Sequence, residues 1–134
     1  MTVVVGFIRS PEGEVALERA IAEARLRTAK LIVVHSMEGG SKESDAEVIA
    51  YREALAEVEG RLQAEGVDHE VIELVQGHTP AEDLLAVADQ TDAELIVIGL
   101  RRRSPVGKLI LGSNAQDVLL QADCPVLAVK AANA

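Results

Sequence analysis

The sequence is short of aromatic residues. It has no tryptophan, one tyrosine (Tyr51) and one phenylalanine (Phe7) among 134 residues, although 49% of its residues are hydrophobic. The core must therefore be built from valine, isoleucine, leucine and alanine, which is typical of helices packed on a buried parallel sheet. Single-stranded nucleic acids are bound largely by stacking on aromatic side chains, so this shortage argues against such a partner.

Cysteine and long apolar segments are also scarce. The single cysteine, Cys124, excludes a disulfide within the chain and fits a reducing compartment, and we interpret it as a small buried hydrophobe. No apolar run approaches the roughly 20 residues of a membrane-spanning helix. The first residues also lack the pattern of a signal peptide. We therefore expect one cytoplasmic domain over residues 1–134, with no membrane partner.

Positive charge is scarce and is concentrated in one place. The chain has 13 Lys and Arg against 22 Asp and Glu, which gives a net charge of −9 at pH 7. Four of its cations lie close together, namely Arg101, Arg102, Arg103 and Lys108. A nucleic-acid polymer needs an extended basic face, which this chain lacks. One cationic loop on an acidic chain instead indicates a small phosphorylated ligand.

Five apolar runs alternate with four segments of helical spacing. The runs cover residues 2–7, 31–34, 71–75, 95–98 and 126–129, and the helical segments begin near residues 11, 45, 79 and 113. This alternation predicts an α/β domain with a mainly parallel sheet. The third run is interleaved with His69, Glu70 and Glu73, so we expect it at an edge of the sheet.

Capping residues mark the expected helix starts. Ser10 followed by Pro11 is typical of an N-cap and a first-turn proline. The segments 79–82 (TPAE) and 113–116 (SNAQ) predict capping boxes, in which two side chains satisfy free backbone N–H groups. Ser113 is the N-cap of the last helix in this interpretation.

The segment before the last helix combines a strand end, the cationic loop and a helix start. Residues 95–98 (LIVI) end at Gly99, and the small residues Gly112, Ser113 and Asn114 come after the cationic loop. Backbone N–H groups at a helix start, together with the helix dipole, bind anions. This segment is therefore the candidate site for a phosphate group.

The histidines are not spaced as a metal cluster. His35 closes the second apolar run, where we interpret it as a polar strand end, with a contact to a ligand as the alternative. His69 and His78 are expected in solvent. No residue is identified as a general base, and no Ser-His-Asp arrangement is found, so an efficient enzyme is the weaker hypothesis.

These motifs and their order resemble the universal stress protein family. The resemblance rests on the opening Val-Gly and Ser-Pro pairs and on residues 79–82 (TPAE), 92–99 (DAELIVIG), 111–113 (LGS) and 123–127 (DCPVL). It implies a single doubly wound, mainly parallel sheet of five strands in the order 3-2-1-4-5, with helices on both faces. Ligands of open α/β sheets bind where the strand order reverses, here beyond Phe7 and Gly99.

Two positions depart from the pattern of the ATP-binding members. Such members carry Gly-x2-Gly-x9-Gly-(Ser/Thr) after the fourth strand. Gly99, Gly112 and Ser113 match this pattern, but Arg102 stands at the middle glycine. The aspartate that these members have after the first strand is replaced by Ile8. The departures leave two interpretations open.

In the first interpretation the chain is a stress-response regulator that binds ATP or a related adenine nucleotide. Arg101, Arg102 and Arg103 would then hold phosphates through their guanidinium groups, together with Gly112, Ser113 and Asn114. Gly99 would allow close approach, and Ile8 and Ser36 would flank the base. Any ATP hydrolysis is expected to be slow, with magnesium left open.

In the second interpretation the chain is an interaction module that needs no nucleotide. Both interpretations include a homodimer, because the family resemblance implies pairing through the last strand. That strand is expected to begin at Pro125 and end at Lys130, and its aliphatic side chains lie at a sheet edge that a second copy can extend.

Overall fold

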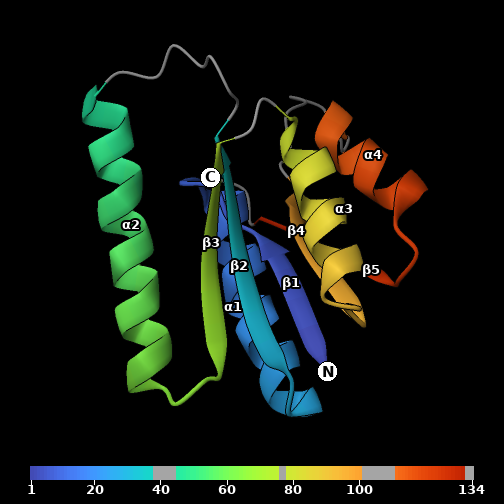
Figure 1. Cartoon of the computed structure of the whole chain (residues 1–134), viewed down its shortest axis with the longest axis horizontal. Coiled ribbons are helices and arrows are strands. Elements are labelled where there is room, and N and C mark those ends of the chain that lie inside the picture. Colours follow the sequence, from blue (N-terminus) through green and yellow to red (C-terminus); the bar gives the residue numbers. More distant parts are fainter. Residues whose placement is uncertain (38–44, 76–77, 101–110, 132–134) are drawn as a thin grey trace.

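The structure is a computed structural model that describes residues 1–37, 45–75, 78–100 and 111–131. Its strands form a single five-stranded parallel sheet in the order β3-β2-β1-β4-β5, with helices on both faces (Figure 1). This order confirms the predicted fold and places both β3 and β5 at edges. Among the described helices, none combines the length and the apolar character needed to cross a membrane.

The elements alternate along the chain as the apolar runs predict. The strands are β1 (Thr2–Gly6), β2 (Lys30–Met37), β3 (His69–Val75), β4 (Leu95–Leu100) and β5 (Val126–Lys130). The helices are α1 (Pro11–Arg27), α2 (Asp45–Ala64), α3 (Pro80–Gln90) and α4 (Ser113–Gln121). The strand β2 is longer than its predicted run because its polar end also pairs with β3.

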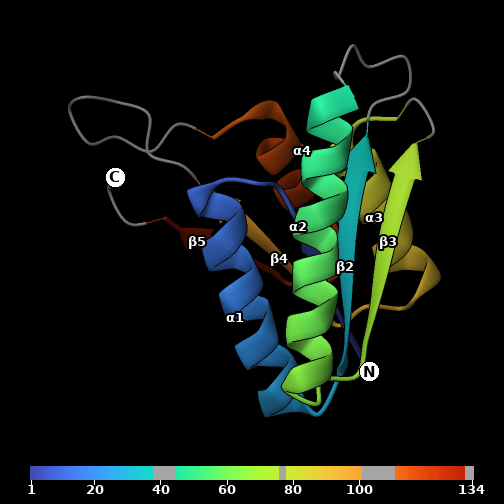
Figure 2. The ribbon, with the colours of Figure 1, turned by 90° about the vertical axis from the view of Figure 1, so that its left-hand side faces the viewer.

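The helices divide between the two faces of the sheet. Figure 2 shows α1 and α2 in front of the sheet, with α3 and α4 behind it. Successive side chains of a strand point to opposite faces. Val3 and Val5 of β1 accordingly belong to the cluster under α1 and α2, whereas Val4 belongs to the cluster under α3 and α4.

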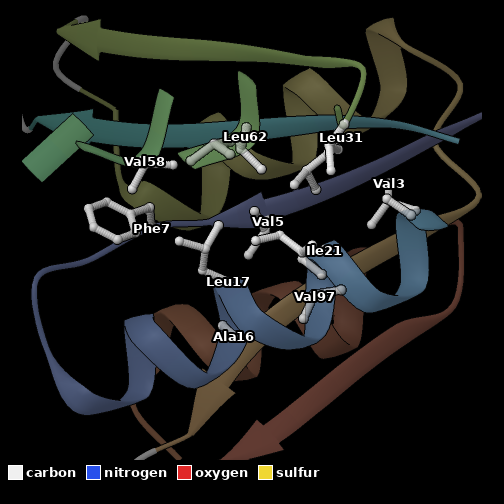
Figure 3. Close-up of a cluster of buried hydrophobic side chains, with 14 of the residues drawn as sticks. Val3, Val5, Phe7, Ala16, Leu17, Ile21, Leu31, Val58, Leu62 and Val97 are labelled. Atoms are coloured by element: carbon white, nitrogen blue, oxygen red, sulfur yellow. The ribbon is translucent and has the colours of Figure 1, made fainter. Parts of the chain in front are cut away.

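The cluster under α1 and α2 is closed and aliphatic. Leu17 of α1 and Leu62 of α2 meet Val5 near its centre, and Phe7 lies beside Val58 at its end (Figure 3). All five of these side chains are at most 7% exposed. Burial of each such side chain stabilises the fold by about 1.5–3 kcal/mol.

Two of the predicted helix starts are confirmed and one is wrong. The Ser10 hydroxyl accepts a hydrogen bond from the Gly13 N–H, and Thr79 and Glu82 form the predicted capping box. Helix α4, however, has Gly112 as its N-cap and Ser113 as its first residue.

The start of α4 is shifted because Gln116 finds a different partner. Its side-chain amide donates to the Leu111 carbonyl over 3.3 Å, and its backbone N–H bonds to the Gly112 carbonyl over 3.0 Å. The side chain of Gln116 therefore bonds to Leu111 and forms no capping box with Ser113. No side-chain hydrogen bond caps α4 at Gly112.

Two of the histidine predictions are also wrong. His35 is 3% exposed on the α2 side, where its ring stacks on Tyr51 with centroids 4.1 Å apart, so it does not close the strand. The ring nitrogens of His69 lie 2.7 Å from the carbonyl oxygen of Val67 and 3.2 Å from a carboxylate oxygen of Glu59, and both oxygens are hydrogen-bond acceptors. Packing of α2 over β2 and β3 removes both rings from open solvent.

The structure agrees better with the expectations for His78 and Cys124. The side chain of His78 is 56% exposed. Cys124 is half-buried rather than fully buried, and desolvation raises the pKa of its thiol. A raised pKa lowers the fraction of reactive thiolate, which agrees with the interpretation of Cys124 as a small hydrophobe.

Candidate functional site

A pocket of about 190 Å³ opens at the carboxyl ends of β1, β2 and β4. The starts of α1, α3 and α4 surround it, so the positive ends of three helix dipoles point toward the same space. The strand order reverses between β1 and β4 at this end of the sheet. A ligand of an open α/β sheet is expected at such a position.

Four predicted site residues from distant parts of the chain line this pocket. Ile8 follows β1, Ser36 lies near the end of β2, Gly99 lies in β4, and Asn114 lies in the first turn of α4. The other walls come from apolar or small residues, namely Gly6, Phe7, Gly13, Val34, Pro80, Ala81, Leu84, Ile98, Ala115 and Val118. The pocket is therefore mostly apolar, with Ser36 and Asn114 as its polar side chains.

The remaining predicted residues lie beside the pocket or beyond the described part of the chain. Gly112 and Ser113 directly precede Asn114, and both are exposed at the start of α4. The predicted cationic residues Arg101, Arg102, Arg103 and Lys108 lie outside the described residues.

A close backbone contact explains why residue 99 is a glycine, and the sequence alone did not indicate this contact. A Cβ atom at Gly99 would lie 2.0 Å from the backbone oxygen of Glu12, at the start of α1. A Cβ atom at Gly13 would likewise lie 1.8 Å from the backbone oxygen of Ile8. These two glycines let the start of α1 contact β4 and the loop after β1 directly, which fixes one rim of the pocket.

Ser36 has a buried acidic partner that sequence reasoning missed. Its hydroxyl donates a hydrogen bond to Oδ2 of Asp83, whose carboxylate is 2% exposed. The Nδ1 atom of His78 lies 3.5 Å from the other carboxylate oxygen of Asp83. An acidic residue in the first turn of a helix is common because it favours the helix dipole. The sequence therefore gave no signal that Asp83 has a second role.

Asn114 joins the starts of two helices across the pocket. Its Oδ1 atom accepts a hydrogen bond from the Ala81 N–H over 3.2 Å, which satisfies one of the free donors at the start of α3. The side-chain NH2 of Asn114 is the other half of the amide and can only donate. The α4 end of the pocket therefore offers donors, which suit the oxygens of a phosphate.

Within the described part of the chain, no group of three His, Cys, Asp or Glu side chains is arranged to hold a metal ion. Glu82, an acidic residue near the pocket, bonds to Thr79 at the start of α3. The backbone N–H and hydroxyl of Thr79 bond to Glu82 and lower the pKa of its carboxyl. The pocket thus combines a mostly apolar lining with the polar side chains of Ser36 and Asn114.

Comparison with known proteins assigns the chain to a family. The model of the universal stress protein family matches residues 1–130. A universal stress protein of Mycolicibacterium smegmatis is 44% identical over 128 residues, which cover 96% of each chain. The solved structure of a universal stress protein from Archaeoglobus fulgidus matches with a TM-score of 0.84 at 43% identity, over 97% of this chain and 98% of that one.

A second solved structure adds a bound ligand. It is a universal stress protein from Archaeoglobus fulgidus in complex with dAMP, and it matches with a TM-score of 0.77 at 37% identity, over 97% of this chain and 98% of that chain. The family model and these relatives span nearly the whole chain, and the observed sheet order is the one that the family resemblance implied. The chain belongs to the universal stress protein family.

Proposed function

We propose that this chain binds an adenine nucleotide in the pocket at the carboxyl ends of β1, β2 and β4, and acts as a nucleotide-responsive regulator in a stress response. The observation that carries the proposal is the meeting of Ile8, Ser36, Gly99 and Asn114, distant in sequence, around one pocket. The complex of the Archaeoglobus fulgidus relative with dAMP supports the choice of ligand class.

The polarity of the pocket sets the orientation of the nucleotide. The start of α4 offers the Asn114 amide and backbone N–H groups, so the phosphates lie at this end. Arg101, Arg102 and Arg103 directly follow β4 in the sequence and carry positive charge. The base lies toward Ser36 on β2, with apolar walls on either side.

The test is to fill the pocket from one wall. Ala115 lines the pocket in the first turn of α4, and Ala115→Leu adds volume there with little loss of helix propensity. Gln121→Leu is the matched control, because it places the same side chain at an exposed position of the same helix. Binding of ATP, ADP, AMP and cyclic AMP is measured by calorimetry, with and without magnesium.

We expect Ala115→Leu to weaken binding at least about tenfold, as for the loss of about 1.4 kcal/mol, and Gln121→Leu to leave it unchanged. Equal affinities in the two variants would place the ligand elsewhere. An absence of heat from every nucleotide with the unaltered protein would overturn the proposal.

A second candidate is an interaction module that works without nucleotide. The observation that favours it is β5, an edge strand whose aliphatic residues are only half-buried. Such an edge can pair with a second copy of the chain. We propose that two copies pair along Val126–Lys130, and the mass of the protein in solution tests this pairing.

A further inference from the structure

We infer that the Ser36–Asp83 pair selects the base of the ligand, favouring a nucleobase that presents an amino group over one that presents a carbonyl group. Adenine presents an amino group at position 6, whereas hypoxanthine presents an oxygen there. The inference rests on the proposed function and goes further, because it names the side chains that read the base and the atom that they read.

The position of Ser36 places it at the base end of the pocket. Ile32 and Val34 of β2 face α3 and α4, and the alternation of the strand puts Ser36 on the same face. Its hydrogen bond to Asp83 of α3 agrees with this direction. Ser36 near the end of β2 and Asn114 at the start of α4 line the pocket from different elements. A nucleotide with its phosphate at α4 brings its base toward Ser36.

The hydrogen bond to Asp83 limits what Ser36 can offer a ligand. A hydroxyl group has one hydrogen to donate and two lone pairs that accept. The hydrogen of Ser36 is directed to a carboxylate that is 2% exposed. Withdrawal of that hydrogen would leave a buried carboxylate oxygen short of a donor, which is costly. Toward the ligand, therefore, Ser36 acts as an acceptor.

Acceptor character at Ser36 discriminates between bases. An amino group can donate a hydrogen bond to the Ser36 oxygen. A carbonyl oxygen at the same place would face the lone pairs of the hydroxyl and find no hydrogen. At the start of α4, Asn114 keeps a donor because its Oδ1 atom is occupied by the Ala81 N–H. Ser36 thus favours the amino group of the base, and Asn114 favours the phosphate of the same nucleotide.

The test compares AMP with IMP, which carry the same ribose and phosphate. They differ in the group at position 6 and in the hydrogen on the neighbouring ring nitrogen, so the phosphate contacts cancel in the ratio of their affinities. Calorimetry is done on the unaltered protein, Ser36→Ala and Ser36→Thr. A hydrogen bond between two neutral groups is worth about 2- to 10-fold in affinity, and we expect AMP to bind tighter than IMP by such a factor.

Each variant has its own expected outcome. Ser36→Ala removes the acceptor, so the ratio of affinities should fall close to one, mainly through weaker AMP binding. Ser36→Thr keeps a hydroxyl and should keep the preference for AMP. Asp83→Asn can donate to the Ser36 oxygen and release the hydroxyl hydrogen for a carbonyl, so it should lower the ratio as well. Thermal unfolding of each variant shows whether it retains the fold.

The outcomes separate this inference from the proposed function. Binding of both nucleotides with equal affinity, or a preference that Ser36→Ala leaves unchanged, would overturn the role of Ser36 while nucleotide binding stands. An absence of binding by AMP and IMP alike would overturn the proposed function, and the inference with it.

Discussion

The two faces of the sheet differ in how their helices meet the carboxyl ends of the strands. Under α1 and α2, Phe7 and Val58 continue the closed aliphatic cluster up to its end (Figure 3). On the side of α3 and α4, a pocket of about 190 Å³ remains between the strands and the starts of these helices, and the start of α1 forms one rim of it. One sheet thus combines a face that mainly stabilises the fold with a face that keeps room for a ligand.

Small residues line both faces but serve opposite purposes. On the α1 side, Gly13 and Gly99 allow the backbone of the helix start to fill the space that a side chain would occupy. On the other side, Ala81 and Ala115 lie at the starts of α3 and α4 and line the pocket. Small residues therefore allow close packing in one place and line a pocket in the other.

The largest effect is expected from adding a methyl group at Gly99. In Gly99→Ala the new Cβ atom would lie 2.0 Å from the backbone oxygen of Glu12, so the start of α1 must move away from β4. Because the clash is with backbone and not with a movable side chain, its cost should exceed the usual overpacking cost of about 1–3 kcal/mol and reach about 4 kcal/mol or more, measured as the loss of unfolding free energy in urea. Gly60→Ala in α2 is the control, because its Cβ atom meets nothing within 4 Å. Equal stability of the two variants would contradict the close contact of α1 with β4.

Truncation of one leucine on each face tests the contrast directly. Leu62 is fully buried in the closed cluster, and Leu62→Ala should cost about 3–4 kcal/mol because it leaves a sealed cavity. Leu84 is 5% exposed and lines the pocket, so Leu84→Ala extends a space that water already reaches. We expect its cost to be nearer about 2 kcal/mol. Urea unfolding that ranked Leu84→Ala as the costlier change would contradict the division into closed and open faces.

The fold could be predicted because buried parallel strands have a simple pattern. The run Leu95–Ile98 is aliphatic at every position since both faces of β4 are covered, and β1 shows the same pattern. The N-caps Ser10 and Thr79 were equally clear, because a capping side chain acts on backbone atoms only a few residues away. Interactions of such short range can be predicted from the local sequence.

The candidate site was only partly predictable because its polar partners come from different elements. Strand alternation directs Ser36 toward α3, but nothing local shows that Asp83 is the residue that it meets there. His35 looked like a polar strand end, since its burial depends on Tyr51 of α2. At α4 the residues 113–116 fit a capping box, yet the helix began one residue earlier in its hydrogen-bonding pattern. Tertiary contacts determine the partner of Ser36 and the burial of His35, whereas the local hydrogen bond of Gln116 to Leu111 accounts for the start of α4.

The smallest effect is expected from removing a charge at the closed face, that of Arg61. Across the closed face, Arg61 of α2 lies 2.6 Å from Glu18 of α1 and 2.7 Å from Glu65. The corresponding link between α3 and α4 is the neutral bond from the Ala81 N–H to Asn114. The link across the closed face should therefore depend on pH.

Arg61 lowers the pKa of the Glu18 and Glu65 carboxyls below their usual value of 4.5. A carboxyl with a lowered pKa in the folded state stabilises the protein above its unfolded pKa, and this contribution is lost as the pH falls through the folded pKa. Arg61→Met should therefore destabilise the protein slightly at neutral pH and leave little difference at a pH well below 4.5. Urea unfolding at both pH values measures this.

Arg52→Met is the control for the charge effect, because Arg52 lies exposed on the same helix and makes no ion pair within the described residues. The pairs of Arg61 are partly exposed, so about 1 M salt should reduce the effect of Arg61→Met as low pH does. A loss of stability that persists at low pH and high salt would assign the contribution of Arg61 to the packing of its aliphatic stem between α1 and α2. The closed face would then be held by apolar contact alone.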